Sequence, residues 1–111
     1  YVKDTANGFM TIADCDAAIG QELNIATGVE HSIGDLANEL IGQINPNAKI
    51  VCEAERLQTE KSEVNRLLGD STKLRELTGW APQYTFEQGL AATIEFLRGN
   101  LDQYKVGQYI L

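Results

Sequence analysis

The chain of 111 residues has the length of one domain, and a domain of this size can bury a modest core of its own. Nine basic against sixteen acidic residues give a net charge of −7. This balance argues against binding to a nucleic-acid backbone, because such binding needs a broad basic face. A small phosphorylated ligand stays compatible with it, since two or three cations in one pocket suffice.

The first half of the chain predicts two helices and two strands. Asp4 is placed to cap a first helix, whose apolar residues recur at near-helical spacing through Ala17. A short strand is predicted over 23–26. Ser32, with Asp35 three residues later, forms a capping box that opens a second helix.

That second helix is expected to end at Asn45-Pro46, and the β-branched run AKIVCEA over 48–54 predicts a second strand. A polar loop follows, and residues 64–68 are a candidate third strand. The spacing then predicts a short helix over 72–79 that ends on Gly79 as its C-cap.

The last part of the chain contains a turn and the most regular helix. Trp80 is expected to cover the core at the turn, and Thr85 with Gln88 forms a second capping box. This order of elements predicts an α/β fold, or a small α+β-like lobe, in which a short sheet is covered by about four helices.

Several kinds of active site are excluded by the motifs that the sequence lacks. It contains no GxGxxG, no P-loop, no Tyr followed four residues later by Lys, and no GxSxG. The single histidine, His31, gives no metal site. Cys15 and Cys52 are predicted to be buried thiols of a reducing compartment, and no apolar run approaches a membrane span, so a cytoplasmic location is expected.

The stretch RLQTEKSEV over 56–64 is the best candidate for binding chemistry. Arg56, Lys61 and Arg66 could direct two or three cations at one diphosphate, and charge-assisted bonds of this kind contribute roughly 1.5–3 kcal/mol each when sheltered. Glu63 could accept hydrogen bonds from ribose hydroxyls. A solvated loop with alternating charges explains the same residues without any ligand.

Longer motifs resemble a known family. YVKDTANGF, IATGVEHSIGDLA, the run from SEVNRLLGD through GWAPQ to AATIEF, and YKVGQY follow one another in the order found in extended short-chain dehydrogenase/reductases that act on nucleotide sugars. The greatest similarity is to NAD-dependent nucleotide-sugar 4,6-dehydratases, and epimerases built from the same halves are the neighbouring alternative.

The resemblance implies that 1–111 is a single C-terminal, substrate-binding domain of a Rossmann-type enzyme. Residues 1–20 would form the junction with a separate NAD-binding Rossmann domain. The chain itself would hold no cofactor and no catalytic residue, NAD would belong to the parent enzyme, and the ligand would be a nucleotide-diphospho-sugar.

The implied substrate-binding residues are Arg56, Gln58, Lys61 and Glu63. The family pattern has a second arginine where this chain has Gln58, and it has proline where this chain has Thr59. Glutamine brings neither charge nor a bidentate fork, so the contact to phosphate should weaken by about 1–2 kcal/mol. By the same resemblance, Asp4 and Trp80 are assigned structural roles.

Two other interpretations stay open. The chain could be a free-standing binding or interaction module derived from that lobe and without enzymatic activity, which Gln58 favours. It could also be a small acidic interaction protein unrelated to the family. If the Rossmann domain does not cover the first helix, apolar surface on that helix should lie exposed and support self-association.

Overall fold

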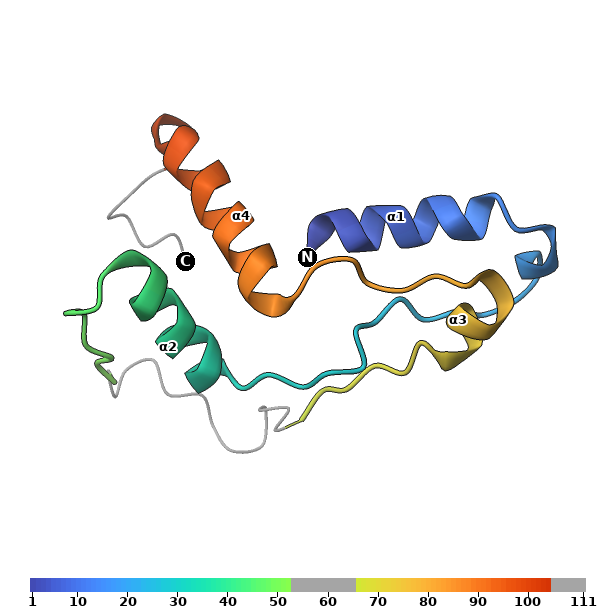
Figure 1. Cartoon of the computed structure of the whole chain (residues 1–111), viewed down its shortest axis with the longest axis horizontal. Helices are drawn as coiled ribbons and strands as arrows, with labels where there is room; N and C mark the ends of the chain where they lie inside the picture. Colours follow the sequence, from blue (N-terminus) through green and yellow to red (C-terminus); the bar gives the residue numbers. More distant parts are fainter. Residues whose placement is uncertain (53–65, 105–111) are drawn as a thin grey trace.

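A computed structural model describes residues 1–52 and 66–104 of the chain. These ranges contain four α-helices, and long irregular segments join them (Figure 1). With the two short 3₁₀ helices, the elements are α1 (Val2–Ala13), η1 (Asp16–Ala18), α2 (Ile33–Ile44), α3 (Thr72–Thr78), α4 (Phe86–Gly99) and η3 (Leu101–Gln103).

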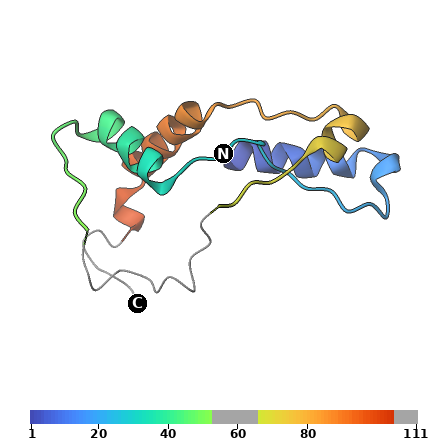
Figure 2. The same cartoon turned by 90° about the horizontal axis from the view of Figure 1, so that it is seen from below.

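The helices form two pairs rather than one compact layer. Helix α1 contacts α3, and α2 contacts α4, with extended segments running between the pairs (Figures 1 and 2). The radius of gyration is 17.7 Å, against about 13 Å for a compact domain of this length. The fold is therefore open.

The predicted sheet is wrong. No strand occurs within the described ranges, and the three segments that were expected to be strands are irregular where the structure describes them. In the β-branched run, Ile50 and Val51 are exposed. Strand propensity largely reflects packing against neighbouring strands, so such a run does not make a strand on its own.

Two of the expected strand segments nevertheless lie side by side. The Ser71 hydroxyl donates to the Ala26 carbonyl at 2.8 Å, and Arg66 reaches Glu30 farther along. A Cβ added to Gly69 would lie 2.6 Å from the Cβ of Ala26. Side chains and a close backbone approach thus join these antiparallel segments in place of a ladder of backbone hydrogen bonds.

The pair formed by α1 and α3 contains most of the buried side chains. Leu74 of α3 is fully buried, and Trp80 just beyond it is 5% exposed, as predicted for a residue covering the core. Gly8 of α1 lies against Ile25, where a Cβ would come within 2.9 Å of the isoleucine side chain. The lack of a side chain at Gly8 therefore lets α1 approach the segment around Ile25 closely.

Asp4 has a structural role that differs from the predicted cap. Helix α1 begins at Val2 with Tyr1 as its N-cap, and the buried Asp4 carboxylate accepts from the backbone N–H groups of Gln83 and Tyr84 at 2.8 and 3.3 Å. The carboxylate thereby ties the start of α1 to the segment that enters α4.

The predicted helix boundaries in the rest of the chain are confirmed. Both capping boxes are formed, Ser32 with Asp35 before α2 and Thr85 with Gln88 before α4. Gly79 ends α3 at φ 72°, in the left-handed region that glycine tolerates best. These signals act over three or four residues, so the local sequence is enough to set them.

The predicted burial of both thiols is wrong. Cys15 is half-buried and Cys52 is exposed, and both are free. Cys52 belongs to the run that was expected to be a central strand, so its exposure has the same cause as the loss of the sheet.

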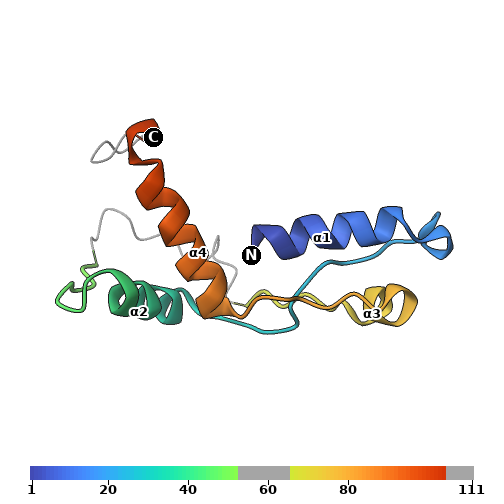
Figure 3. The same ribbon diagram turned by 45° about the horizontal axis from the view of Figure 1, so that its top comes forward.

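The pair formed by α2 and α4 is packed less tightly. No residue of α2 is buried, whereas α4 buries Gly89 and Ile94. Gly89 lies under Tyr1, since a Cβ there would come within 2.9 Å of the tyrosine Cβ. Figure 3 shows α4 rising beside the N-terminal end of α1, and this approach creates the concave surface described next.

Candidate functional site

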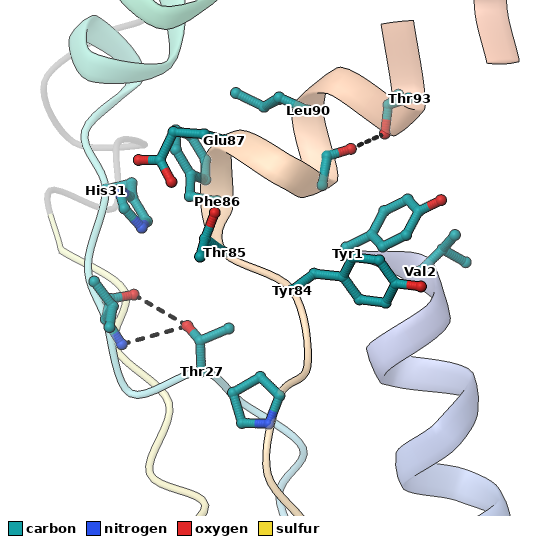
Figure 4. A pocket seen from close by; sticks show the side chains of 13 residues that line it. Tyr1, Val2, Thr27, His31, Tyr84, Thr85, Phe86, Glu87, Leu90 and Thr93 are labelled. Carbon is teal, nitrogen blue, oxygen red and sulfur yellow. Dashed lines mark hydrogen bonds between the residues drawn. The ribbon is translucent and has the colours of Figure 1, made fainter. Parts of the chain in front are cut away.

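A groove of about 640 Å³ lies where three parts of the chain meet. The start of α1, the segment before α2 and the first two turns of α4 form its walls (Figure 4). Most of its lining is apolar or aromatic: Tyr1, Val2, Val29, Pro82, Tyr84, Phe86 and Leu90.

Two aromatic pairs define the groove. Tyr1 and Tyr84 meet edge to face with ring centroids 4.9 Å apart and planes at 70°. His31 stacks on Phe86 with centroids 3.9 Å apart and planes at 10°. Ring faces of this kind are surfaces on which a nucleobase can stack.

Most hydroxyl groups in the groove are engaged by nearby backbone. Thr93 donates to the Gly89 carbonyl at 2.8 Å, and Thr27 bonds to the backbone of Val29 (Figure 4). The Thr85 hydroxyl accepts from the Gln88 N–H as part of the capping box. These bonds fix the walls of the groove.

Glu87 is the acidic group of the groove. Hydrogen bonds from its own backbone N–H and from Thr85, with a smaller contribution from the charge of His31, hold the pKa of the Glu87 carboxyl below its ordinary value. An ionised carboxylate accepts hydrogen bonds only, so Glu87 is suited to the hydroxyl groups of a ligand.

The groove lining contains no lysine or arginine within the described residues. A diphosphate placed here would face Glu87 without a compensating guanidinium or ammonium group. The described part of the groove is therefore suited to a ring and its hydroxyls, and cations for phosphate would have to come from another segment.

Arg66 joins the groove to the predicted binding loop. Its guanidinium makes a two-pronged ion pair with Glu30, with Nη2 to Oε2 at 2.7 Å and Nε to Oε1 at 3.0 Å. The same hydrogen bonds lower the pKa of Glu30 and raise the pKa of Arg66. Glu30 stands between Val29 and His31, which both line the groove.

The ion pair has two consequences for the predicted site. Arg66, one of the three cations predicted to bind a diphosphate, is paired with Glu30 instead. The cations still expected to reach a diphosphate are therefore Arg56 and Lys61. Arg66, the first described residue after the predicted binding loop, is also held by Glu30 beside the groove. The four predicted site residues, Arg56, Gln58, Lys61 and Glu63, lie outside the described residues, and their role stays a prediction.

The aromatic groove was not predicted from the sequence. Its partners are far apart in the chain, 55 residues in the case of His31 and Phe86. The one available signal is that both flank a capping residue, His31 before Ser32 and Phe86 after Thr85. That signal places each ring at a helix start but does not bring the two helix starts together.

The structure gives no sign of a metal site or a membrane span in the ranges that it describes. No group of three or more metal-ligating side chains occurs there. None of the helices in those ranges has the length and apolar character needed to cross a bilayer.

Comparison with known proteins identifies the family. A family model described as GDP-mannose 4,6 dehydratase matches residues 1–93. The chain belongs to the NAD-dependent epimerase/dehydratase family. No solved structure matches it at a significant level.

Its relatives catalyse different reactions on nucleotide sugars, judging by their names. UDP-glucose 4-epimerase from Mycolicibacterium smegmatis is 33% identical over 98 residues, which cover 88% of this chain and 30% of the relative. UDP-glucuronic acid decarboxylase 1 from Xenopus tropicalis is 30% identical over 110 residues, which cover 99% and 25%. dTDP-D-glucose 4,6-dehydratase from Mus musculus is 29% identical over 108 residues, which cover 95% and 30%.

The chain therefore spans between a quarter and a third of the length of these relatives.

Within this family, NAD requires residues that can cradle its diphosphate. The sequence has no glycine-rich strand-to-helix turn of that kind, and the groove lining offers no cation in the described ranges. The lining of the groove in the described ranges therefore offers no cradle for the NAD diphosphate.

Proposed function

We propose that this chain is the nucleotide-sugar-binding lobe of an NAD-dependent sugar-nucleotide enzyme and is not catalytic by itself. The groove would take the nucleoside or the sugar, and Arg56 and Lys61 would hold the diphosphate. Among family reactions, a 4,6-dehydratase is our first choice, because the matching family model carries that description. An epimerase is the second.

The observation that carries the proposal is the ion pair between Arg66 and Glu30. It holds Arg66, three residues beyond the loop over 56–63, next to a segment whose side chains line the groove. Cations from the loop and aromatic rings from the groove could then engage the two ends of one nucleoside diphosphate. In this arrangement the lobe would contribute binding and orientation, and NAD and the reacting groups would lie on a separate domain.

Binding should depend on the loop cations and not on positive charge in general. We expect Arg56→Ala to weaken binding of the preferred nucleoside diphosphate about tenfold or more, since a charge-assisted phosphate contact contributes roughly 1.5–3 kcal/mol. Arg98→Ala is the matched control, because Arg98 lies near the end of α4 and pairs with Glu95. Isothermal titration calorimetry with UDP, GDP and dTDP gives the comparison.

Two results would contradict the proposal. One is equal weakening by Arg56→Ala and Arg98→Ala, which would indicate attraction by general charge. The other is binding of all three nucleotides that neither substitution changes.

A second candidate function is a free-standing binding or interaction module that derives from such a lobe and takes no part in an enzyme reaction. The observation in its favour is Gln58, which stands where the family pattern has an arginine. Gln58→Arg separates the two candidates. In a working substrate lobe it should tighten diphosphate binding by up to about tenfold through a bidentate contact, whereas a module with another ligand would gain nothing.

A further inference from the structure

One end of the groove combines a flat aromatic surface with the Glu87 carboxylate. His31 stacks on Phe86 with the ring planes at 10°, and Glu87 is the next residue of α4. Figure 4 shows the Glu87 carboxylate beside the Phe86 ring, on the same side as His31. His31 is exposed, whereas Phe86 is half-buried. Because Phe86 covers one face of the imidazole, the opposite face remains for a ligand ring.

The start of α4 fixes the position of Glu87. The residue lies in the first turn, behind the capping box of Thr85 and Gln88, and the Gln43 side chain of α2 donates to the Glu87 carbonyl at 3.4 Å. The Glu87 carboxylate accepts from its own backbone N–H and from Thr85. An ionised carboxylate has about four acceptor sites, so these two bonds leave lone pairs for the donors of a ligand.

The surroundings of Glu87 determine which ligand edge it can accept. No lysine or arginine of the described groove lining neutralises the carboxylate, so it attracts N–H donors and repels acceptor atoms. Guanine presents two adjacent donors, the N1–H and the 2-amino group, which match the two oxygens of one carboxylate. Uracil and thymine present one N–H between two carbonyls, and adenine and cytosine present an amino group beside an acceptor nitrogen. Guanine is therefore the nucleobase whose edge fits this carboxylate.

We infer that the groove binds the base of the ligand against the His31–Phe86 stack and that Glu87 selects guanine through its N1–H and 2-amino group. This inference rests on the proposed function and adds to it the identity of the base, since the preferred ligand would then be a GDP-linked sugar. The names of the relatives include UDP-, dTDP- and GDP-linked sugars, so the comparisons leave the base open.

Ribose hydroxyl groups are the alternative partner of the same carboxylate, because they are donors too. A contact to ribose would be shared by all the nucleoside diphosphates and would give no preference among their bases. A contact to the base edge would act on guanine alone. The dependence of binding on the base therefore decides between the two.

Isothermal titration calorimetry of the full chain with GDP, UDP, dTDP and inosine diphosphate tests the inference. A good bidentate contact to a base edge discriminates by about five- to 150-fold, so GDP should bind more tightly than UDP and dTDP by a factor in that range. Inosine diphosphate differs from GDP only in lacking the 2-amino group, and it should bind about tenfold more weakly than GDP.

Glu87→Gln tests the residue itself. Glutamine keeps the size of the side chain and replaces one acceptor oxygen with an NH₂ donor. The variant should lose about tenfold or more in GDP affinity. It should bind UDP at least as tightly as the wild type, because an amide can pair with one N–H and one carbonyl of uracil.

Glu95→Gln is the matched control, because it makes the same change on the same helix at a residue that pairs with Arg98. It should leave the affinities for GDP and UDP unchanged, and helical circular dichroism verifies that both variants are folded. An equal loss of GDP affinity in Glu87→Gln and Glu95→Gln would indicate a general effect of charge and would overturn the inference. Equal weakening of GDP and UDP by Glu87→Gln would assign the carboxylate to ribose and would overturn it as well.

The same titrations separate a failure of this inference from a failure of the proposed function. If the four nucleotides bind equally and Arg56→Ala weakens each of them, the selection of guanine is wrong and the nucleotide-binding lobe stands. If none of the four binds at millimolar concentration, both are wrong. A preference for GDP that Glu87→Gln removes and Glu95→Gln retains is the result that we expect.

Discussion

The two helix pairs of this molecule are held in different ways. In the pair formed by α1 and α3, buried side chains join segments that are far apart in the sequence, as Asp4 does with the backbone of Gln83 and Ser71 with that of Ala26. In the pair formed by α2 and α4, both helices have complete capping boxes, yet α2 buries no residue at all. A helix can thus be well specified locally and still be weakly fixed in space.

The difference matters because the candidate site lies where the two pairs meet. Tyr1 belongs to the firmly held pair, whereas His31 and Phe86 stand at the entrances to α2 and α4. One wall of the groove therefore rests on a buried core, and the other rests on helix caps and on the ion pair of Glu30 with Arg66. Binding of a ligand would be expected to fix the second wall more than the first.

The largest effect should come from the core of the firmly held pair. Leu74→Ala removes a fully buried side chain and should lower the free energy of unfolding by about 2–5 kcal/mol. Leu67→Ala, the same change at an exposed leucine, should alter it by less than about 0.5 kcal/mol. Urea denaturation followed by Trp80 fluorescence measures both, and equal effects would mean that Leu74 does not stabilise a buried core between α1 and α3.

The next effect concerns the buried carboxylate of α1. Asp4→Ala leaves the N–H groups of Gln83 and Tyr84 without their acceptor and should lower the free energy of unfolding by about 2–3 kcal/mol. Asp16→Ala is the control at an exposed aspartate, with little expected change. If Asp4→Ala left the free energy of unfolding unchanged in the same assay, the hydrogen bonds between Asp4 and the segment that enters α4 would not stabilise the fold as described.

A smaller effect is expected in the weakly held pair. Ser32→Ala removes the cap of α2, at a cost of about 1 kcal/mol. Because α2 lacks buried residues, the loss should appear as reduced helical circular dichroism while Trp80 fluorescence remains unchanged. A simultaneous change of both signals would show that α2 is coupled to the core more strongly than its burial indicates.

The smallest effect is the pH dependence of the same cap. Hydrogen bonds from the Ser32 side chain and backbone, with a minor contribution from the charge of His31, lower the pKa of Asp35 below its ordinary 3.8. The stabilisation is therefore fully present above pH 3.8 and is lost as the pH falls through the lower pKa of the folded state. In the Asp35→Asn variant the carboxylate is absent, so the helical circular dichroism of α2 should no longer fall on acidification through this pKa. An acid titration of the variant that is identical to that of the wild type would contradict this.

What could be predicted from the sequence follows the same division. Capping boxes and the C-cap at Gly79 depend on neighbours within three or four residues, and the helix boundaries that they set are confirmed. The expected strands needed partners from distant segments, and the β-branched run around Ile50 found none within the described residues. Local pattern specifies a helix but leaves a sheet dependent on the rest of the chain.

The candidate site shows the same limit. The tie between Asp4 and residues 83–84 spans 79 or more positions, and the stacking of His31 on Phe86 spans 55. Neither has a local signature, so a structure was needed to find them. The charged loop over 56–63 was predicted from its resemblance to a family motif, and its role stays a prediction because it lies outside the described residues.

The most direct test of the central claim is a titration of the full chain with UDP, GDP and dTDP, followed residue by residue in amide NMR spectra. We predict that one nucleotide shifts two sets of signals together, those of the loop around Arg56 to Glu63 and those of the groove at His31, Tyr84 and Phe86. Absence of shifts in both sets at millimolar concentrations of all three nucleotides would contradict a nucleotide-binding lobe. Shifts in the loop alone would contradict the part assigned to the groove.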